Sequence, residues 1–147
     1  MTHGEYSEVV HGFGVGEMLR TFIKWWIDNG WDSGRYRVEV PFACEAGYGG
    51  KTDIGGEDYI IDLKTKTTKK GYKIIMYPES GMQLAAYGKG IGGEDRRLIN
   101  VVISSTEPGR IEMVEWTDKR DGLYKCFMNA FEVWKYLNSY DPTTGKE

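Results

Sequence analysis

The chain has 147 residues and a formal net charge of −3; 40% of its residues are hydrophobic and 14% are aromatic. This length and composition predict a single globular domain over residues 1–147 and exclude a disordered or collagen-like chain. No apolar run approaches the roughly 20 residues that span a bilayer, and the first residues lack the pattern of a secretory signal. We therefore expect a cytoplasmic protein that does not associate with a membrane.

The sequence holds two cysteines, Cys44 and Cys126. Zinc sites and iron–sulfur clusters built from thiolates usually need four cysteines, often as C-x-x-C pairs. We expect no iron–sulfur cluster, and we interpret both cysteines as free thiols in the core of a protein from a reducing compartment.

Hydrophobic periodicity predicts elements in the order helix, three strands, helix, two strands, helix. The predicted helices cover residues 14–29, 78–89 and 118–140. The predicted strands cover residues 35–42, 52–54, 59–67, 98–104 and 110–116. The strand at 98–104 is an apolar run of the kind that is covered on both faces. The order indicates an α/β fold in which helices flank a central mixed β-sheet.

Two aspartates and a lysine fall on the predicted hairpin of residues 52–67. Because side chains alternate across a strand, Asp62 and Lys64 share one face. In a hairpin with an even number of loop residues, Asp53 lies on that face too. Two carboxylates so placed repel each other unless one is protonated, hydrogen bonds compensate or a cation binds both, and oxygen ligands of this kind suit a hard divalent metal.

The register of this hairpin has two solutions. A loop formed by residues 57 and 58 places Asp53 directly opposite Asp62, with Cβ atoms about 5 Å apart. A loop formed by residues 55 and 56 places Asp58 opposite Asp53 instead. The shared face of the two aspartates is the same in both solutions.

The segment from residue 64 to 73 holds five lysines and no acidic residue, which leaves −8 on the rest of the chain. Such local positive charge is suited to DNA phosphates, although a solubilising loop is the other interpretation. We predict that phosphates bind the lysines that follow Lys64: Lys66, Lys69, Lys70 and Lys73.

Three short motifs follow one another in this part of the chain. They are Gly50-Lys-Thr-Asp53, Ile60-Ile-Asp62-Leu-Lys64-Thr-Lys, and Gln83-Leu-Ala-Ala-Tyr87. In order and spacing they resemble the G-x-x-D, D-x-K and Q-x-x-x-Y series of the PD-(D/E)XK nucleases, in particular the RecB-like branch with its phage-type exonucleases. The resemblance covers residues 38–87 and implies a restriction-endonuclease-like core.

The resemblance also implies roles for these residues. Asp53, Asp62 and the backbone carbonyl of Leu63 would hold Mg²⁺ or Mn²⁺, Lys64 would face the attacking water, and Gln83 with Tyr87 would position the strand being cut. Lys64 would act either as the base or, if the carboxylates keep it protonated, as an electrostatic stabiliser.

The implied activity is that of a metal-dependent DNA exonuclease in recombination, repair or phage DNA processing. Its substrate would be single- or double-stranded DNA with free ends, in the cytoplasm of a bacterial or phage-infected cell. A homo-oligomer or a recombination partner protein would fit such a role.

The sequence departs from the family at the first helix, where members often carry a metal-binding histidine and this chain has Gly16. Glu17 and His11 are the two candidates to replace it. Two alternatives stay open: an endonuclease or junction resolvase of the same fold and, because that histidine is missing, a non-catalytic nucleic-acid-binding module.

Overall fold

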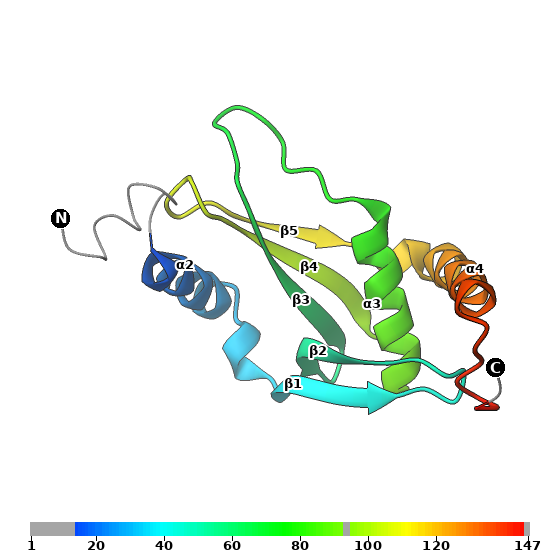
Figure 1. Cartoon of the computed structure of the whole chain (residues 1–147). Coiled ribbons are helices and arrows are strands. Elements are labelled where there is room, and N and C mark those ends of the chain that lie inside the picture. The colour runs from blue at the N-terminus through cyan, green and yellow to red at the C-terminus, as the bar shows by residue number, and fades with distance from the viewer. Residues whose placement is uncertain (1–13, 93–94, 146–147) are drawn as a thin grey trace. The chain divides into compact units, whose positions relative to one another are not determined.

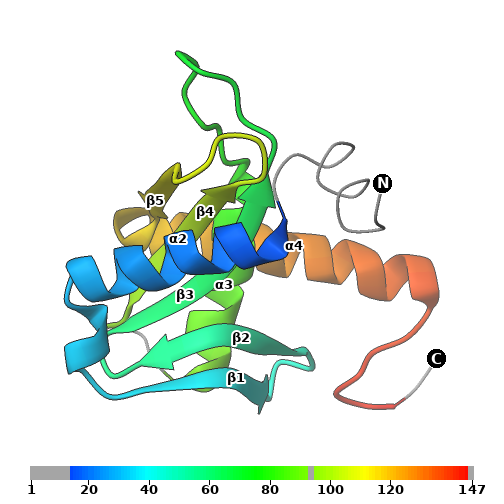
Figure 2. The same ribbon diagram turned by 90° about the vertical axis from the view of Figure 1, so that its left-hand side faces the viewer.

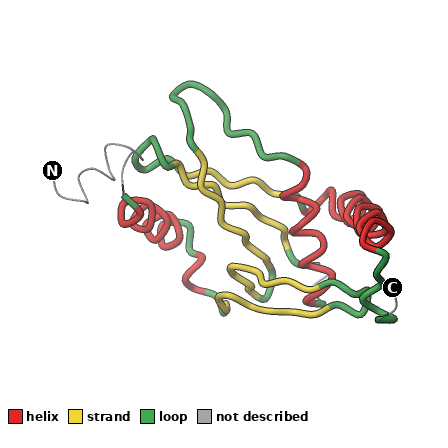
Figure 3. The backbone as a smooth tube through the Cα atoms, in the orientation of Figure 1, coloured by secondary structure: helices red, strands yellow, loops and turns green. Residues whose placement is uncertain are grey.

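The computed structural model describes residues 14–92 and 95–145. The elements, in chain order, are α2 (Val15–Asp28), η1 (Trp31–Ser33), β1 (Tyr36–Ala43), β2 (Gly49–Gly56), β3 (Tyr59–Lys66), α3 (Pro78–Ile91), β4 (Arg97–Ser104), β5 (Ile111–Glu115), η2 (Thr117–Lys119) and α4 (Arg120–Asn138) (Figure 1). The predicted order of helices and strands is confirmed, as the tube in Figure 3 shows by type.

The chain forms two compact units, each built from three stretches of sequence. Among the described residues, the first unit comprises residues 14–35, 63–75 and 101–114, and the second comprises residues 36–62, 76–100 apart from 93 and 94, and 115–145. The boundary between them crosses β3 between Asp62 and Leu63.

The five strands form one sheet in the order β1-β2-β3-β4-β5, with β1–β2 and β2–β3 antiparallel. β3 and β4 run parallel. The Arg97 N–H donates to the Asp58 carbonyl at the start of both strands, and the Ser105 N–H donates to the Lys66 carbonyl at the end of both. The partners in each pair are equally far apart in sequence, as they are when two strands run in the same direction. A parallel pair needs a crossover connection, which α3 supplies.

β4 and β5 are antiparallel neighbours. The Ser104 N–H donates to the Arg110 carbonyl near the turn, and the Trp116 N–H donates to the Leu98 carbonyl at the far end. One parallel pair among antiparallel ones makes the sheet mixed, as predicted. The α/β class is confirmed with it.

The edge strand β1 extends past the predicted end. The predicted strand covers residues 35–42, whereas the observed strand pairs Pro41 with Lys51 and continues to Ala43. Proline cannot donate to the ladder, and an edge strand tolerates it because one side of its backbone has no partner strand.

β4 forms the centre of the core, as its apolar sequence predicts. All of its residues after Arg97 are buried. In the second unit α3 approaches the sheet closely, and Gly88 lies against Leu98 and Ile60. Small residues on the inner side of α3 therefore bring its backbone near the strands.

The close packing of α3 gives a test of the fold. Gly→Ala in a helix interior normally stabilises by about 1 kcal/mol. At Gly81 the added Cβ would lie 2.8 Å from the Trp116 ring and 2.9 Å from Leu123, so we expect Gly81→Ala to lower the melting temperature, by an overpacking cost of about 1–3 kcal/mol. Gly122→Ala in α4, where no heavy atom lies within 4 Å of the added Cβ, is the control and should raise it. Thermal melts followed by circular dichroism measure both.

Both cysteines are free thiols, as predicted, but the predicted core position is wrong for Cys126. Cys44 is half-buried and Cys126 is exposed. The inward side of α4 carries Leu123 and Phe127, and Cys126 lies about 100° around the helix from Phe127. Within residues 14–92 and 95–145, no helix has the length and apolar character needed to cross a membrane.

Candidate active site

The strand pairs of the β2–β3 hairpin select one of the two predicted registers. Ile54 pairs with Ile61 and Gly55 with Ile60, so the loop consists of residues 57 and 58. Continued by one residue, this register would place Asp53 opposite Asp62, both within the second unit. Two carboxylates at such positions repel each other unless a cation or hydrogen bonds compensate.

Asp62 is a buried carboxylate, with 5% of its surface exposed. Its Oδ2 accepts a hydrogen bond of 2.8 Å from Nδ2 of Asn100, which is fully buried on β4. The same Nδ2 lies 3.4 Å from the backbone carbonyl oxygen of Asp62. In turn, Oδ1 of Asn100 accepts a hydrogen bond of 2.9 Å from the indole N–H of Trp116.

The sequence analysis missed Asn100 and Trp116. The signal that could have found Asn100 is its place inside the run Leu98-Ile-Asn-Val-Val-Ile-Ser104, because a polar side chain in a strand buried on both faces needs a hydrogen-bonding partner. No sequence signal identifies that partner.

The glutamine and tyrosine of the third motif contact each other on α3. Gln83 Nε2 donates to the Tyr87 hydroxyl at 2.7 Å, as the i, i+4 spacing allows. The Tyr87 ring packs edge-on against Phe42, with centroids 5.2 Å apart. A Cβ at Gly50 would lie 2.8 Å from the Tyr87 ring. The glycine of the first motif therefore makes room for the tyrosine of the third, within the second unit.

Leu63 and Lys64 lie beyond the unit boundary, in the first unit. Both are half-buried residues of β3, the strand that also carries Asp62. The shared face of Lys64 and Asp62 stays a prediction from the alternation of side chains along a strand.

Of the two candidates for the missing histidine ligand, Glu17 lies in the first turn of α2. Its carboxylate forms an ion pair of 2.8 Å with Arg20. In the first unit α2 lies beside the β4–β5 turn (Figure 2), and Glu17 lines a hollow of about 400 Å³ together with residues that include Trp25 and Ile111. His11 lies outside the described residues.

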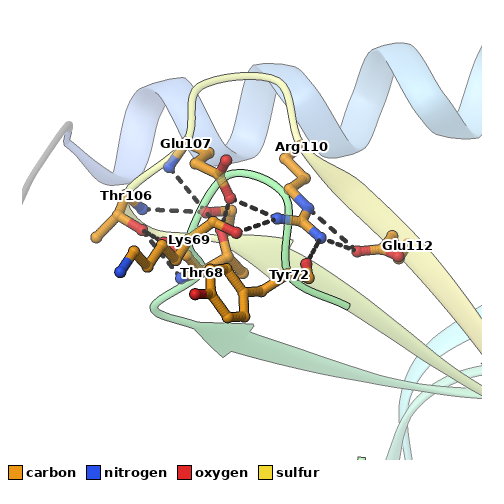
Figure 4. Close-up of polar contacts among 8 residues, drawn as sticks. Thr68, Lys69, Tyr72, Thr106, Glu107, Arg110 and Glu112 are labelled. Atoms are coloured by element: carbon orange, nitrogen blue, oxygen red, sulfur yellow. Dashed lines mark hydrogen bonds and ion pairs between the residues drawn. The ribbon is translucent and has the colours of Figure 1, made fainter. Parts of the chain in front are cut away.

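Arg110, just before β5, holds the lysine-rich segment in place (Figure 4). Its guanidinium donates to the backbone carbonyls of Lys69 and Tyr72, at 3.2 and 2.6 Å. It also forms ion pairs with Glu107 at 2.6 Å and Glu112 at 3.0 Å. Two carboxylates thus orient one guanidinium toward the segment that carries the lysines.

Thr68 fastens the same segment to the β4–β5 turn (Figure 4). Its hydroxyl bonds to the Glu107 carboxylate and lies 2.6 Å from the Ser104 hydroxyl. Its N–H donates to Thr106 Oγ1 at 3.0 Å, and the Thr106 hydroxyl donates back to the Thr68 carbonyl at 2.8 Å. Hydrogen bonds from Thr68 and Arg110 hold the pKa of the Glu107 carboxyl below its ordinary value. The Glu107 carboxyl is therefore ionised at neutral pH. Its contacts with Thr68 and Arg110 weaken only in acid, when the carboxyl becomes protonated.

Among the four lysines of this segment, Lys69, Lys70 and Lys73 are exposed and Lys66 is half-buried. Lys66 Nζ donates to the Ile75 carbonyl at 2.5 Å, and Lys69 Nζ lies 5.1 Å from the centre of the Tyr72 ring. Lys70 and Lys73 are therefore the best placed of the four to meet a phosphate.

The donor set of the hairpin fits a divalent cation only in part. Asp53 and Asp62 supply carboxylate oxygens from opposite strands, and Mg²⁺ is commonly bound by one or two carboxylates while it keeps several waters. Over the part of the chain that the structure describes, no group of three or more His, Cys, Asp or Glu residues gathers to hold a metal.

No family model matches the chain, and no curated protein matches it. Among solved structures it is similar to a crystal structure of SSO0001, with 22% sequence identity and a TM-score of 0.40. The similarity covers 69% of this chain and 48% of that one. The chain thus spans about half the length of that structure.

Proposed function

We propose that this protein is a metal-dependent DNA exonuclease with a restriction-endonuclease-like core, hydrolysing phosphodiester bonds from DNA ends. The observation that carries the proposal is the hairpin register, which pairs Ile54 with Ile61 and whose continuation sets Asp53 opposite the buried Asp62. Lys64 follows Asp62 by two residues on β3. The contact between Gly50 and Tyr87 supports it, because it joins the first and third motifs in one unit.

In the proposed reaction Asp53, Asp62 and the carbonyl of Leu63 would hold Mg²⁺ or Mn²⁺. When bound, the ion would polarise the phosphodiester and lower the pKa of a coordinated water. Lys64 takes the proton of the attacking water or stabilises the charge that develops on the phosphate. Gln83 and Tyr87, already hydrogen-bonded to each other, hold the strand being cut.

Lys70 and Lys73 supply a positive surface for the phosphate backbone. The segment that carries them is held by Arg110 and Thr68, so fewer conformations are lost when DNA binds. Tyr72, which is 62% exposed, lies on the same segment and offers a ring on which an unpaired base can stack.

The decisive experiment compares end-labelled linear DNA, single- and double-stranded, with a closed circle of the same sequence. We expect Mg²⁺ or Mn²⁺ to support loss of the linear substrates from their ends, a chelator to stop it, and the circle to survive. A cut circle would instead favour an endonuclease or junction resolvase. Retention of DNA without cutting under any divalent ion would favour a non-catalytic binding module.

The lysine-rich segment has its own test. If Lys70 and Lys73 contact phosphates, the affinity for single-stranded DNA falls with salt at a log–log slope of about −0.7 per contact. We expect Lys70→Gln with Lys73→Gln to flatten this slope by about 1.4 and to weaken binding equally across sequences. Lys119→Gln with Lys125→Gln makes the same change in net charge near and on α4 and is the control. An unchanged slope in the first pair would place the binding surface elsewhere.

A further inference from the structure

A buried chain of hydrogen bonds joins Trp116 to Asn100 and Asn100 to Asp62. Trp116 and Asn100 have no role in the proposed reaction. We propose that Asn100, itself oriented by Trp116, is a positioning residue that holds the Asp62 carboxylate in the orientation in which it binds a divalent cation. The inference rests on the proposed function, because it concerns the same metal site.

Trp116 settles which way the Asn100 amide points. An indole N–H is a donor only, so the atom that receives it at 2.9 Å is the amide oxygen. The amide nitrogen therefore faces Asp62. Without Trp116, the oxygen and nitrogen of the amide could exchange places and present an acceptor to the carboxylate.

The Asn100 amide nitrogen lies near two atoms of Asp62, the side-chain oxygen at 2.8 Å and the backbone oxygen at 3.4 Å. This pair of contacts fixes the torsion of the carboxylate relative to its own strand. Metal affinity depends on such outer partners, since a ligand that rotates freely must be ordered when the ion binds.

The position of Asn100 argues for a role beyond packing. Its neighbours on β4, Ile99 and Val101, are fully buried, as is Asn100 itself. A leucine of similar size would fill the same core without burying a polar group. The amide at this position satisfies one indole donor and one carboxylate acceptor, and the carboxylate is the one that the metal needs.

The test is a calorimetric titration of the metal-free full chain with Mn²⁺, alongside DNA cleavage by the parent. We expect Asn100→Leu to weaken Mn²⁺ binding by about 10–100-fold, in the range known for outer partners of metal ligands. Trp116→Phe keeps a ring in place but removes the N–H donor, and it should weaken binding in the same direction by a smaller factor. It also carries the test if Asn100→Leu does not fold, as judged by circular dichroism.

Ser104→Ala is the matched control, because Ser104 is also a fully buried, hydrogen-bonded polar residue of β4. It should lower the melting temperature and leave Mn²⁺ affinity unchanged. If folded Asn100→Leu and Trp116→Phe bind Mn²⁺ as the parent does while the parent cuts DNA, the positioning role is wrong and the nuclease stands. A different result would be a parent protein that cuts no DNA but whose Mn²⁺ binding is weakened by Asn100→Leu. That result would reject the nuclease proposal and keep the positioning role of Asn100. A parent that binds no Mn²⁺ would overturn both.

Discussion

Asp62→Asn is expected to remove divalent-metal binding and to lower DNA cleavage by roughly a thousandfold, since metal-ion catalysis contributes several kcal/mol and each 1.36 kcal/mol is a factor of ten. Asparagine has the same shape as aspartate and leaves the hairpin intact. Its side-chain oxygen can still accept the hydrogen bond from Asn100. The metal-free variant should therefore fold, which circular dichroism verifies.

Melting with and without Mn²⁺ checks this prediction together with the cleavage assay. A ligand that binds only the folded state stabilises it by about 2.7 kcal/mol at a hundredfold excess over Kd, so Mn²⁺ should raise the melting temperature of the parent and not that of Asp62→Asn. Asp118→Asn, an exposed aspartate near α4, is the control and should respond to Mn²⁺ as the parent does. Equal stabilisation of Asp62→Asn would exclude Asp62 as a ligand.

Lys64→Ala is expected to lower the cleavage rate by about 10²–10⁴-fold, the range contributed by a general acid or base, while Mn²⁺ and DNA affinities stay close to the parent values. The reason is that Lys64 acts on the water or the phosphate in the transition state and not on the ground state. Lys64→Arg should also be slow, because a guanidinium stays protonated and its planar fork does not replace a point charge.

Single-turnover cleavage and calorimetry measure the two halves of this prediction. Lys51→Ala is the matched control, since Lys51 lies in the first motif on the adjacent strand and pairs with Glu39 at 3.0 Å. It should keep the parent rate. A rate for Lys64→Ala within tenfold of the parent would remove Lys64 from the mechanism.

Local pattern alone determined a large part of this protein. The order of helices and strands and the buried strand β4 follow from periodicity, because backbone geometry repeats every 3.6 residues in a helix and every two in a strand. The end of α3 follows only approximately, since the predicted helix ends at residue 89 and the observed one continues to Ile91, before Gly92 takes the left-handed conformation with φ of 77°.

The tertiary structure decided what depends on contacts between distant residues. Two loop positions satisfied the hairpin sequence, and the pairing of Ile54 with Ile61 selected the one that sets Asp53 opposite Asp62. The partners of Asn100 lie 38 residues before it and 16 after it, and no local period relates them. The lysine-rich segment likewise has the composition of a solvated loop. Its backbone is nevertheless held by hydrogen bonds from Arg110, at the end of the β4–β5 turn. Periodicity specifies which face a side chain takes, whereas its partner across a sheet depends on strand order and register, which only packing of the whole chain establishes.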